Sequence, residues 1–508
     1  MPITKHQSII PLTDTGQIHQ RRGNFKQALA CYEQALTLAQ EQDNAAQMAA
    51  GLNRIGEIYQ HWGDLSLALD NYQRALTHAE AGSNKKEQVI ALNGMGEINL
   101  IQDNLTQAQS CFEQARAIAQ AANDQTGLAW SLKNIAGLSL MSGELHQALD
   151  YYEQALALTG TADEPVLAVY CLNGIGLIHR SRGDKIQAQA SHQKALTIAQ
   201  KAGDQTALVQ CFNYLGLLCK QQGEMSQAQD YYESALITAR KIGLKGQQAI
   251  LLNNLGQIAH QRGHMDQALD NYQQAYAHFK EMGSNVSNAG ILNNIGLIHQ
   301  HRGALANALL AYEKALALTE TANLKSQAVT LRNNIGQIYH RRGELEQALT
   351  YYEQALITAR EIGHKPQAAL CLANIGQVYH QQGNLEQALT IYKQARTIFE
   401  TADDKFNIAV ILNNIGGIYQ VQQDWAQALN YYQQALVLDR QIDHQAGIAR
   451  ELMNIGALYV KQRNFAQAEP ILMQAIELFT TLNSPQVEQT QAWLDQARAG
   501  LANMYMLN

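Results

Sequence analysis

The chain has 508 residues, of which 16% are charged, and its net charge is −7 at pH 7. A negative chain is a poor match for nucleic acid, which selects for basic surfaces. No run of 18 apolar residues is present, so the sequence predicts no membrane span, and the six scattered cysteines are typical of a reduced, cytoplasmic protein.

Residues 1–8 are predicted to form an N-terminal extension, and no apolar run long enough for a secretion signal follows the first Met. From residue 9 a repeat of 40 residues continues without insertion or deletion to residue 484. Alanine occupies Ala28 and every fortieth position up to Ala468, and again Ala35 and every fortieth up to Ala475. A strict period of this length predicts stacked copies of one supersecondary unit, here twelve of them.

Each copy contains two helical patterns, as the copy that begins near Gln47 illustrates. From Leu52 to Tyr59 the residues of one face recur at intervals of three and four, which predicts a helix that ends at Gly63. Asp64 can satisfy the free N–H groups that begin a second helix, which runs from residue 65 to residue 81. The sequence therefore predicts helical hairpins and an all-α fold.

Small residues recur where the two helices of a hairpin must meet. Gly56 lies on the first helix and Ala68 on the second, and Tyr72 is predicted to fill the remaining gap. Ala75 would allow the same close approach to the next hairpin. A single hairpin cannot bury its apolar face, so neighbouring hairpins must stack.

Each copy has a large apolar residue, Leu or Ile, Gly and Tyr, in that order, followed by Ala, Tyr and Ala. This pattern resembles the tetratricopeptide repeat (TPR). The 40-residue unit, with Leu-Asn-Asn-Ile-Gly as in Leu292–Gly296, is most similar to kinesin light chain, the Pins-type adaptors and bacterial TPR regulators. The resemblance implies a right-handed superhelical solenoid over residues 9–484 whose concave surface is lined by first helices. Residues 485–508, with Trp493 and Leu494 on a helical spacing, are predicted to form a capping helix.

Asparagine recurs in two adjacent columns of the first helices, although Asn in mid-helix costs about 0.5–0.7 kcal/mol relative to Ala. Two interpretations remain open: the carboxamides bind the backbone of a guest peptide, or they form a ladder between neighbouring hairpins. The candidate peptide-binding residues in these columns are Asn173, Asn213, Asn253, Asn254, Asn293, Asn294, Asn333, Asn334, Asn374, Asn413, Asn414 and Asn454.

Further polar side chains flank the two columns and complete the predicted binding surface. They are Gln257, Gln337, Gln377, His340, His380 and Arg341. The surface is therefore expected to be polar and mildly basic, which favours a neutral or acidic extended segment over a basic one. The alternative is an ordinary solvated helix face.

Two other side-chain types are candidate ligand sites. His260, His340 and His380 share one column, but like positions of adjacent helices lie about 8–10 Å apart, which is too far for a shared metal ion. Trp130 either anchors a ligand side chain or packs between hairpins.

The sequence contains none of the phosphate-loop, serine-hydrolase or zinc-protease motifs, so no enzyme activity and no cofactor are predicted. The favoured function is an adaptor that binds a protein or peptide along its concave surface. Two alternatives remain: a scaffold that self-associates through its ends, and a peptide-sensing regulator.

Overall fold

The computed structural model of the chain describes residues 9–102, 104–162, 164–282, 284–321 and 324–506. The predicted extension at residues 1–8 lies outside this description. The described residues form 25 α-helices and no strand, so the predicted all-helical fold of paired helices is confirmed. None of these helices combines the length and apolarity needed to cross a lipid bilayer.

Odd-numbered helices up to α23 are the first helices of the hairpins. They are α1 (Ile9–Arg21), α3 (Ala45–Trp62), α5 (Lys85–Ile101), α7 (Gln125–Met141), α9 (Pro165–Ser181), α11 (Gln205–Gln221), α13 (Lys245–Gln261), α15 (Asn285–His301), α17 (Lys325–Arg341), α19 (Lys365–Gln381), α21 (Lys405–Val421) and α23 (Gln445–Lys461).

Even-numbered helices are the second helices, and α25 follows the last hairpin. They are α2 (Phe25–Glu41), α4 (Leu65–Ala81), α6 (Leu105–Ala121), α8 (Leu145–Ala162), α10 (Lys185–Ala202), α12 (Met225–Ile242), α14 (Met265–Glu281), α16 (Leu305–Thr321), α18 (Leu345–Glu361), α20 (Leu385–Thr401), α22 (Trp425–Gln441), α24 (Phe465–Thr481) and α25 (Gln486–Met506).

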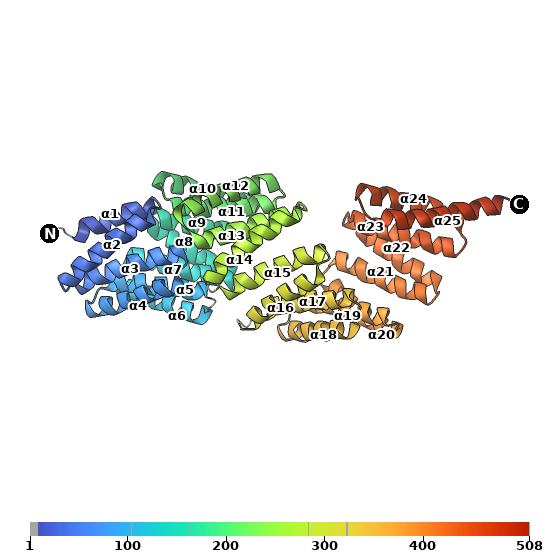
Figure 1. Ribbon diagram of the computed structural model, residues 1–508, viewed down its shortest axis with the longest axis horizontal. Coiled ribbons are helices and arrows are strands. Elements are labelled where there is room, and N and C mark those ends of the chain that lie inside the picture. The colour runs from blue at the N-terminus through green and yellow to red at the C-terminus, as the bar shows by residue number, and fades with distance from the viewer. Residues whose placement is uncertain (1–8, 103, 163, 283, 322–323, 507–508) are drawn as a thin grey trace. The chain divides into compact units, whose positions relative to one another are not determined.

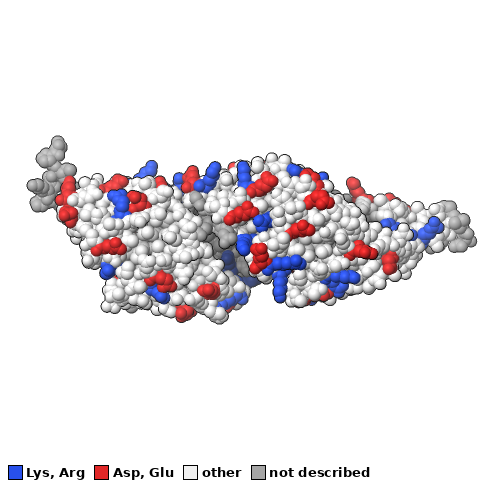
Figure 2. All heavy atoms as spheres, turned by 90° about the horizontal axis from the view of Figure 1, so that it is seen from below, with Lys and Arg blue, Asp and Glu red and all other residues white. Residues whose placement is uncertain are grey.

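The helices fall into two compact units, residues 1–318 and residues 319–508. Within each unit the hairpins stack side by side in chain order (Figure 1). On the face shown in Figure 2, acidic and basic side chains are interspersed among a majority of uncharged residues. The low charged fraction of the sequence is therefore visible as a mainly neutral surface.

The turns on either side of α4 form as their residues predict. Gly63 ends α3 with φ of +78°, a left-handed conformation that glycine adopts without steric cost. Asp64 Oδ1 then accepts a hydrogen bond from Leu67 N at 3.3 Å, and Asn84 Oδ1 accepts one from Glu87 N at 3.3 Å. Each side chain satisfies a free N–H group of the helix that it begins.

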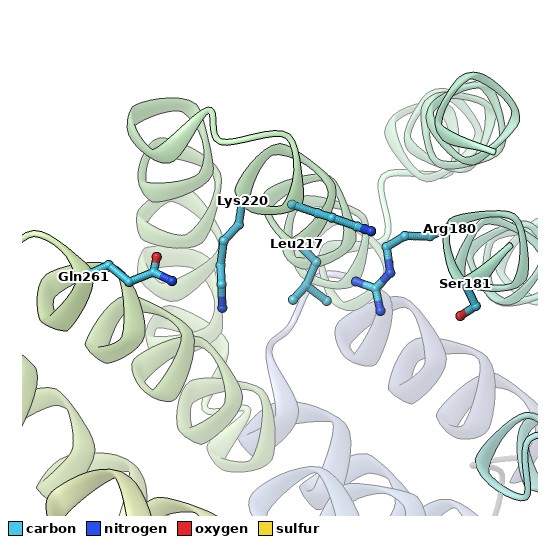
Figure 3. Close-up of a pocket in the computed structure, with 6 residues that line it drawn as sticks. Arg180, Ser181, Leu217, Lys220 and Gln261 are labelled. Carbon is cyan, nitrogen blue, oxygen red and sulfur yellow. The ribbon is translucent and has the colours of Figure 1, made fainter. Parts of the chain in front are cut away.

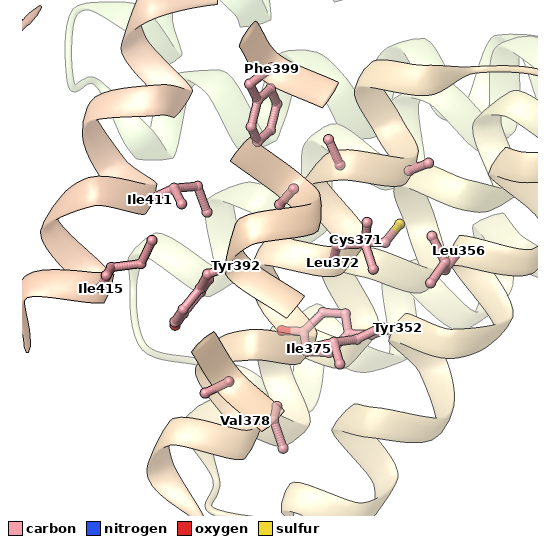
Figure 4. Packing of buried hydrophobic residues seen from close by; sticks show 14 of the residues in the cluster. Tyr352, Leu356, Cys371, Leu372, Ile375, Val378, Tyr392, Phe399, Ile411 and Ile415 are labelled. Atoms are coloured by element: carbon pink, nitrogen blue, oxygen red, sulfur yellow. The ribbon is translucent and has the colours of Figure 1, made fainter. Parts of the chain in front are cut away.

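In most hairpins a glycine on the first helix makes room for the aromatic ring that closes the hairpin, although α7 has Ala136 in its place and Gly456 on α23 faces Leu472. A Cβ atom added to Gly376 would lie 2.6 Å from Cε1 of Tyr392, closer than real contacts allow. Tyr392 is fully buried, as is Tyr352 in the preceding hairpin. Figure 4 shows these rings among Ile375, Val378 and other apolar side chains of the second unit. The predicted steric role of the glycine and tyrosine columns is thus confirmed.

Helix α25 packs against both helices of the last hairpin. Its buried Leu494 and Ala497 contact Val460, Ala468 and Leu472. Helix α25 therefore buries apolar side chains of the last hairpin.

Candidate functional site

The first helices line the inner side of each stack. Within both units successive first helices, such as α3 and α5 or α19 and α21, pack more closely than successive second helices do. A stack of hairpins curves toward the side on which its helices are closest. The two Asn columns therefore lie on helices of the inner side.

The Asn side chains form a ladder between consecutive first helices. In each rung, an Asn of the second column donates from Nδ2 to Oδ1 of an Asn of the first column in the preceding hairpin. The rungs are Asn134–Asn93 at 3.1 Å, Asn254–Asn213 at 3.0 Å, Asn294–Asn253 at 3.3 Å, Asn374–Asn333 at 3.3 Å and Asn454–Asn413 at 2.7 Å. Because each rung joins residues 41 apart, the ladder fixes the register of adjacent hairpins.

Several Asn side chains of the first column also donate a hydrogen bond to the first helix of the following hairpin. Asn93 Nδ2 contacts Ser131 Oγ at 3.0 Å, and Asn333 Nδ2 contacts Cys371 Sγ at 3.2 Å. Asn173 Nδ2 makes the equivalent contact with Cys211 Sγ at 3.6 Å. Of the two interpretations that the sequence left open, the ladder is therefore directly seen.

Burial divides the predicted binding residues into two groups. Asn173, Asn213 and Asn254 are 1%, 6% and 6% exposed, so they are corrected from candidate peptide contacts to buried residues that bond neighbouring side chains. The other carboxamides are half-buried, namely Asn253, Asn293, Asn294, Asn333, Asn334, Asn374, Asn413, Asn414, Asn454, Gln257, Gln337 and Gln377. Most of the half-buried candidates therefore lie on consecutive first helices of the second unit.

The flanking side chains of the second unit lie beside the ladder. His340 and His380 are half-buried and Arg341 is exposed. His340 Nε2 lies 2.6 Å from Gln381 Oε1, and burial lowers the pKa of His380 below its usual range. We call the following residues the inner face of the second unit: Asn333, Asn334, Gln337, His340, Arg341, Asn374, Gln377, His380, Asn413, Asn414, Gly417 and Asn454.

One rung of the ladder is missing within the inner face. Ala373 occupies the position where a first-column Asn would accept a bond from Asn414. Nδ2 of Asn414 is buried and has no hydrogen-bond partner in the described residues. The next turn of α21 carries Gly417, where an added Cβ would meet nothing closer than His380 Cε1 at 3.7 Å. A methyl group at Gly417 would therefore make only ordinary van der Waals contact, one helical turn from the unsatisfied amide of Asn414.

Of the histidine and tryptophan candidates, His260 and Trp130 lie in the first unit, whereas His340 and His380 lie in the second. His260 Nε2 and His301 Nδ1 lie 3.2 Å apart. No group of three or more potential metal ligands occurs within the ranges that the structure describes. Trp130 is half-buried and Lys133 Nζ lies 5.2 Å from its ring, so this Trp packs against a neighbouring side chain.

A feature that the binding prediction omitted is a break in the tyrosine column. His192 stands where nine of the other hairpins have Tyr. Its Nδ1 lies 2.9 Å from Asn173 Oδ1, and its ring stacks on Tyr214. Burial, with a smaller effect from Arg180, lowers the pKa of His192 to about 4. The sequence did carry a signal for this site, because His192 departs from a column that holds Tyr in nine of the twelve hairpins.

Stacked helical hairpins with a shared inner face define a helical repeat protein. The chain belongs to the tetratricopeptide repeat family: the family model "Tetratricopeptide repeat" matches residues 10–81, 211–281, 247–321, 326–401 and 407–481. A second model, "MalT-like TPR region", matches residues 73–244. A search of curated proteins gave no match.

Solved structures show the same fold at low sequence identity. One is a signal transduction ATPase with numerous domains (STAND) and a tetratricopeptide repeat sensor, from Pyrococcus horikoshii, at 15% identity and a TM-score of 0.52 over 74% of this chain. This chain covers 53% of that protein, about half its length. The quorum sensor NprR from B. thuringiensis, in its apo form, is 14% identical with a TM-score of 0.52, and the match covers 70% of this chain and 99% of NprR.

Proposed function

We propose that the protein is an adaptor that binds an extended segment of a partner protein along the inner face of the second unit. The observation that carries this proposal is the succession of half-buried carboxamides on α17, α19 and α21. Asn374 uses one N–H group in its rung with Asn333. A carboxamide has two N–H groups and an acceptor oxygen, so Asn374 can still form hydrogen bonds with a guest backbone.

The spacing of the helices suits an extended guest. Packed helices lie about 8–10 Å apart, and an extended chain advances about 3.3 Å per residue. Carboxamides from successive hairpins would therefore meet roughly every third residue of the guest. Main-chain bonding of this kind requires an extended backbone and few particular side chains.

The charge of the inner face selects among guests. Its residues include His340, Arg341 and His380 but no Asp or Glu. A neutral or acidic segment would meet no like charge there, whereas a basic segment would approach only neutral and basic groups. We therefore propose a neutral or acidic guest.

Substitutions at Gly417 give a direct test of the proposed binding. Short random peptides displayed on phage are selected against the full chain, and the selected peptides are measured by fluorescence anisotropy. We expect Gly417→Phe, which fills the inner face, to abolish binding, while Gly417→Ala retains it. Asn374→Ala combined with Gln377→Ala should weaken binding roughly 10- to 30-fold, as expected for two lost neutral hydrogen bonds.

Circular dichroism and thermal unfolding of each variant serve as the control for folding. An added Cβ at Gly417 would meet His380 Cε1 at 3.7 Å, an ordinary van der Waals contact, so Gly417→Ala should fold normally, and the unfolding curve of Gly417→Phe shows whether the larger side chain is tolerated. Selected peptides that bind Gly417→Phe as tightly as the wild type must occupy another surface, and the proposal would then be wrong.

A further inference from the structure

Consecutive first helices also meet near their C-terminal ends, in the same register as the Asn ladder. The rung between Asn253 on α13 and Asn294 on α15 joins residues 41 apart. His260 and His301 each follow one of these residues by seven positions, about two helical turns, and contact each other. A comparison of like positions, which are 40 apart, does not bring these two histidines together.

Other joints between hairpins carry different side chains at this offset. At the preceding joint the two residues are Lys220 and Gln261, and Figure 3 shows Gln261 extending from α13 toward Lys220 on α11 at a pocket that both line. In the second unit His340 Nε2 lies 2.6 Å from Gln381 Oε1. In the whole sequence, only α13 and α15 place two imidazoles at these positions.

The two imidazoles are spaced like ligands of one metal ion. Nε2 of His260 and Nδ1 of His301 lie 3.2 Å apart, and the ring centroids lie 5.1 Å apart. Two nitrogens on one tetrahedral Zn²⁺ lie about 3.3–3.4 Å apart, with ring centroids about 5.2 Å apart. Rings that point head-on at each other across the same gap would have centroids about 5.5 Å apart. The pair is therefore closer to two ligands that converge on one ion.

The surroundings of the pair tolerate a cation. His260 is the penultimate residue of α13 and His301 is the last residue of α15, so both lie where the carbonyl groups of a helix end carry partial negative charge. Arg302, which follows His301, pairs with Asp266 at 2.5 Å. His301 is exposed and His260 is half-buried, so water can reach an ion bound between them.

The ligand type determines which metal ions fit. Imidazole is a good ligand for Zn²⁺, Ni²⁺ and Cu²⁺, whereas Mg²⁺ and Ca²⁺ prefer oxygen ligands. An ordinary imidazole is mostly neutral at about pH 7.5, so its lone pair is available. The described residues provide no third ligand, so water completes the coordination and the ion is exchangeable.

We propose that His260 and His301 together bind one divalent ion of the zinc, nickel and copper class. The two ligands lie on helices whose register the Asn253–Asn294 rung already fixes. The second imidazole therefore binds at a high effective concentration once the first has bound. The bound ion joins α13 to α15 within the first unit and does not depend on a guest peptide.

Calorimetric titration of the full chain, free of affinity tags and stripped of metal with EDTA, tests the proposal. We expect one tightly bound Zn²⁺ or Ni²⁺ per chain and no binding of Mg²⁺ at the same concentration. His260→Gln and His301→Gln should each weaken binding at least about ten-fold, because the chelating pair is lost. Zn²⁺ binding that is equal in the wild type and both variants would overturn the proposal.

The matched control is His264→Gln. It removes an exposed imidazole from the turn that follows α13 and leaves the pair intact. We expect this variant to bind Zn²⁺ as tightly as the wild type. Equal losses in His264→Gln and His260→Gln would mean that scattered surface histidines bind the metal, and the proposal would be wrong.

The second unit allows a test by gain of function. His340 and Gln381 are 41 apart and in contact, and the Asn333–Asn374 rung lies two turns earlier on the same helices. Gln381→His should therefore create a second pair of imidazoles and raise the number of tightly bound Zn²⁺ ions from one to two per chain. A number that stays at one would contradict the geometry on which the proposal rests.

Two further measurements count the ligands and report on the fold. With one equivalent of Cu²⁺, electron paramagnetic resonance should show splitting from two nitrogens in the wild type and from one in His301→Gln. Zn²⁺ should raise the Tm of the wild type more than that of His301→Gln, because it binds the folded pair. Circular dichroism confirms that each variant is folded. Splitting from a single nitrogen in the wild type would rule out the shared site.

Discussion

Nδ2 of Asn454 donates a hydrogen bond to Oδ1 of Asn413 at 2.7 Å and so joins helix α23 to helix α21. Both side chains are half-buried, and the bond links hairpins whose backbones make no hydrogen bond to each other here. Equivalent Asn–Asn bonds occur in both units. They explain why Asn is found in the middle of these helices despite its low helix propensity.

The energy of one rung can be measured with a matched pair of variants. Asn413→Ala removes the acceptor of the rung, whereas Asn430→Ala changes an exposed Asn within α22. Both gain about 0.6 kcal/mol of helix propensity, so this term cancels in the comparison. We expect Asn413→Ala to be less stable than Asn430→Ala by about 1 kcal/mol in urea unfolding. Equal stabilities would mean that the ladder contributes only to register.

Two adjacent glycines in α21 should respond in opposite directions to the same change. An added Cβ at Gly416 would lie 2.7 Å from Cε1 of Tyr432, but at Gly417 the nearest atom lies at 3.7 Å. We expect Gly416→Ala to destabilise the protein by about 1–3 kcal/mol through overpacking. Gly417→Ala should stabilise it by roughly 0.5–1 kcal/mol, because alanine loses less backbone entropy in a helix. Thermal and urea unfolding of both variants checks the sign.

The repeat pattern predicted most of the fold because its residues act locally. Gly63 ends a helix, Asn84 begins one and Gly376 accommodates Tyr392, and each role follows from residue type and spacing alone. The site was harder to predict because a half-buried amide can bond sideways or face solvent with the same periodicity. Spacing could not show that Asn173 is buried while Asn374 is half-buried, since this depends on how neighbouring hairpins pack.

Glu451 should make the second unit less stable as the pH rises. Burial raises the pKa of this carboxyl to about 7, although Arg450 opposes the shift with an Nε–Oε1 contact of 3.0 Å. The folded state therefore holds this proton more tightly than the unfolded state, whose carboxyl titrates near its usual value. The stabilisation is complete below the unfolded pKa and is lost as the pH rises through about 7.

The matched variant is Glu451→Gln, which keeps the shape and removes the titration. A shift of this size corresponds to a loss of roughly 3 kcal/mol between pH 4.5 and pH 8 in the wild type. We expect urea unfolding over this range to show a smaller decrease for Glu451→Gln. Parallel pH profiles of the two proteins would contradict this assignment.

His192 should produce the opposite slope in the first unit. Its pKa of about 4 in the folded protein lies below the ordinary histidine value, because burial and then the charge of Arg180 disfavour the imidazolium. The unfolded state therefore binds the proton first as the pH falls. The contribution of His192 is fully present above the unfolded pKa near 6.5 and is lost as the pH falls toward 4.

His192→Tyr tests this slope because Tyr occupies the same position in most other hairpins and does not titrate in this range. We expect the wild type to lose more stability than the variant between pH 7 and pH 4, by an amount of order 3 kcal/mol. Far-UV circular dichroism with urea at each pH gives the two profiles. The exposed His264 supplies the control. His264→Gln removes one histidine without changing the core, and its pH profile should match that of the wild type.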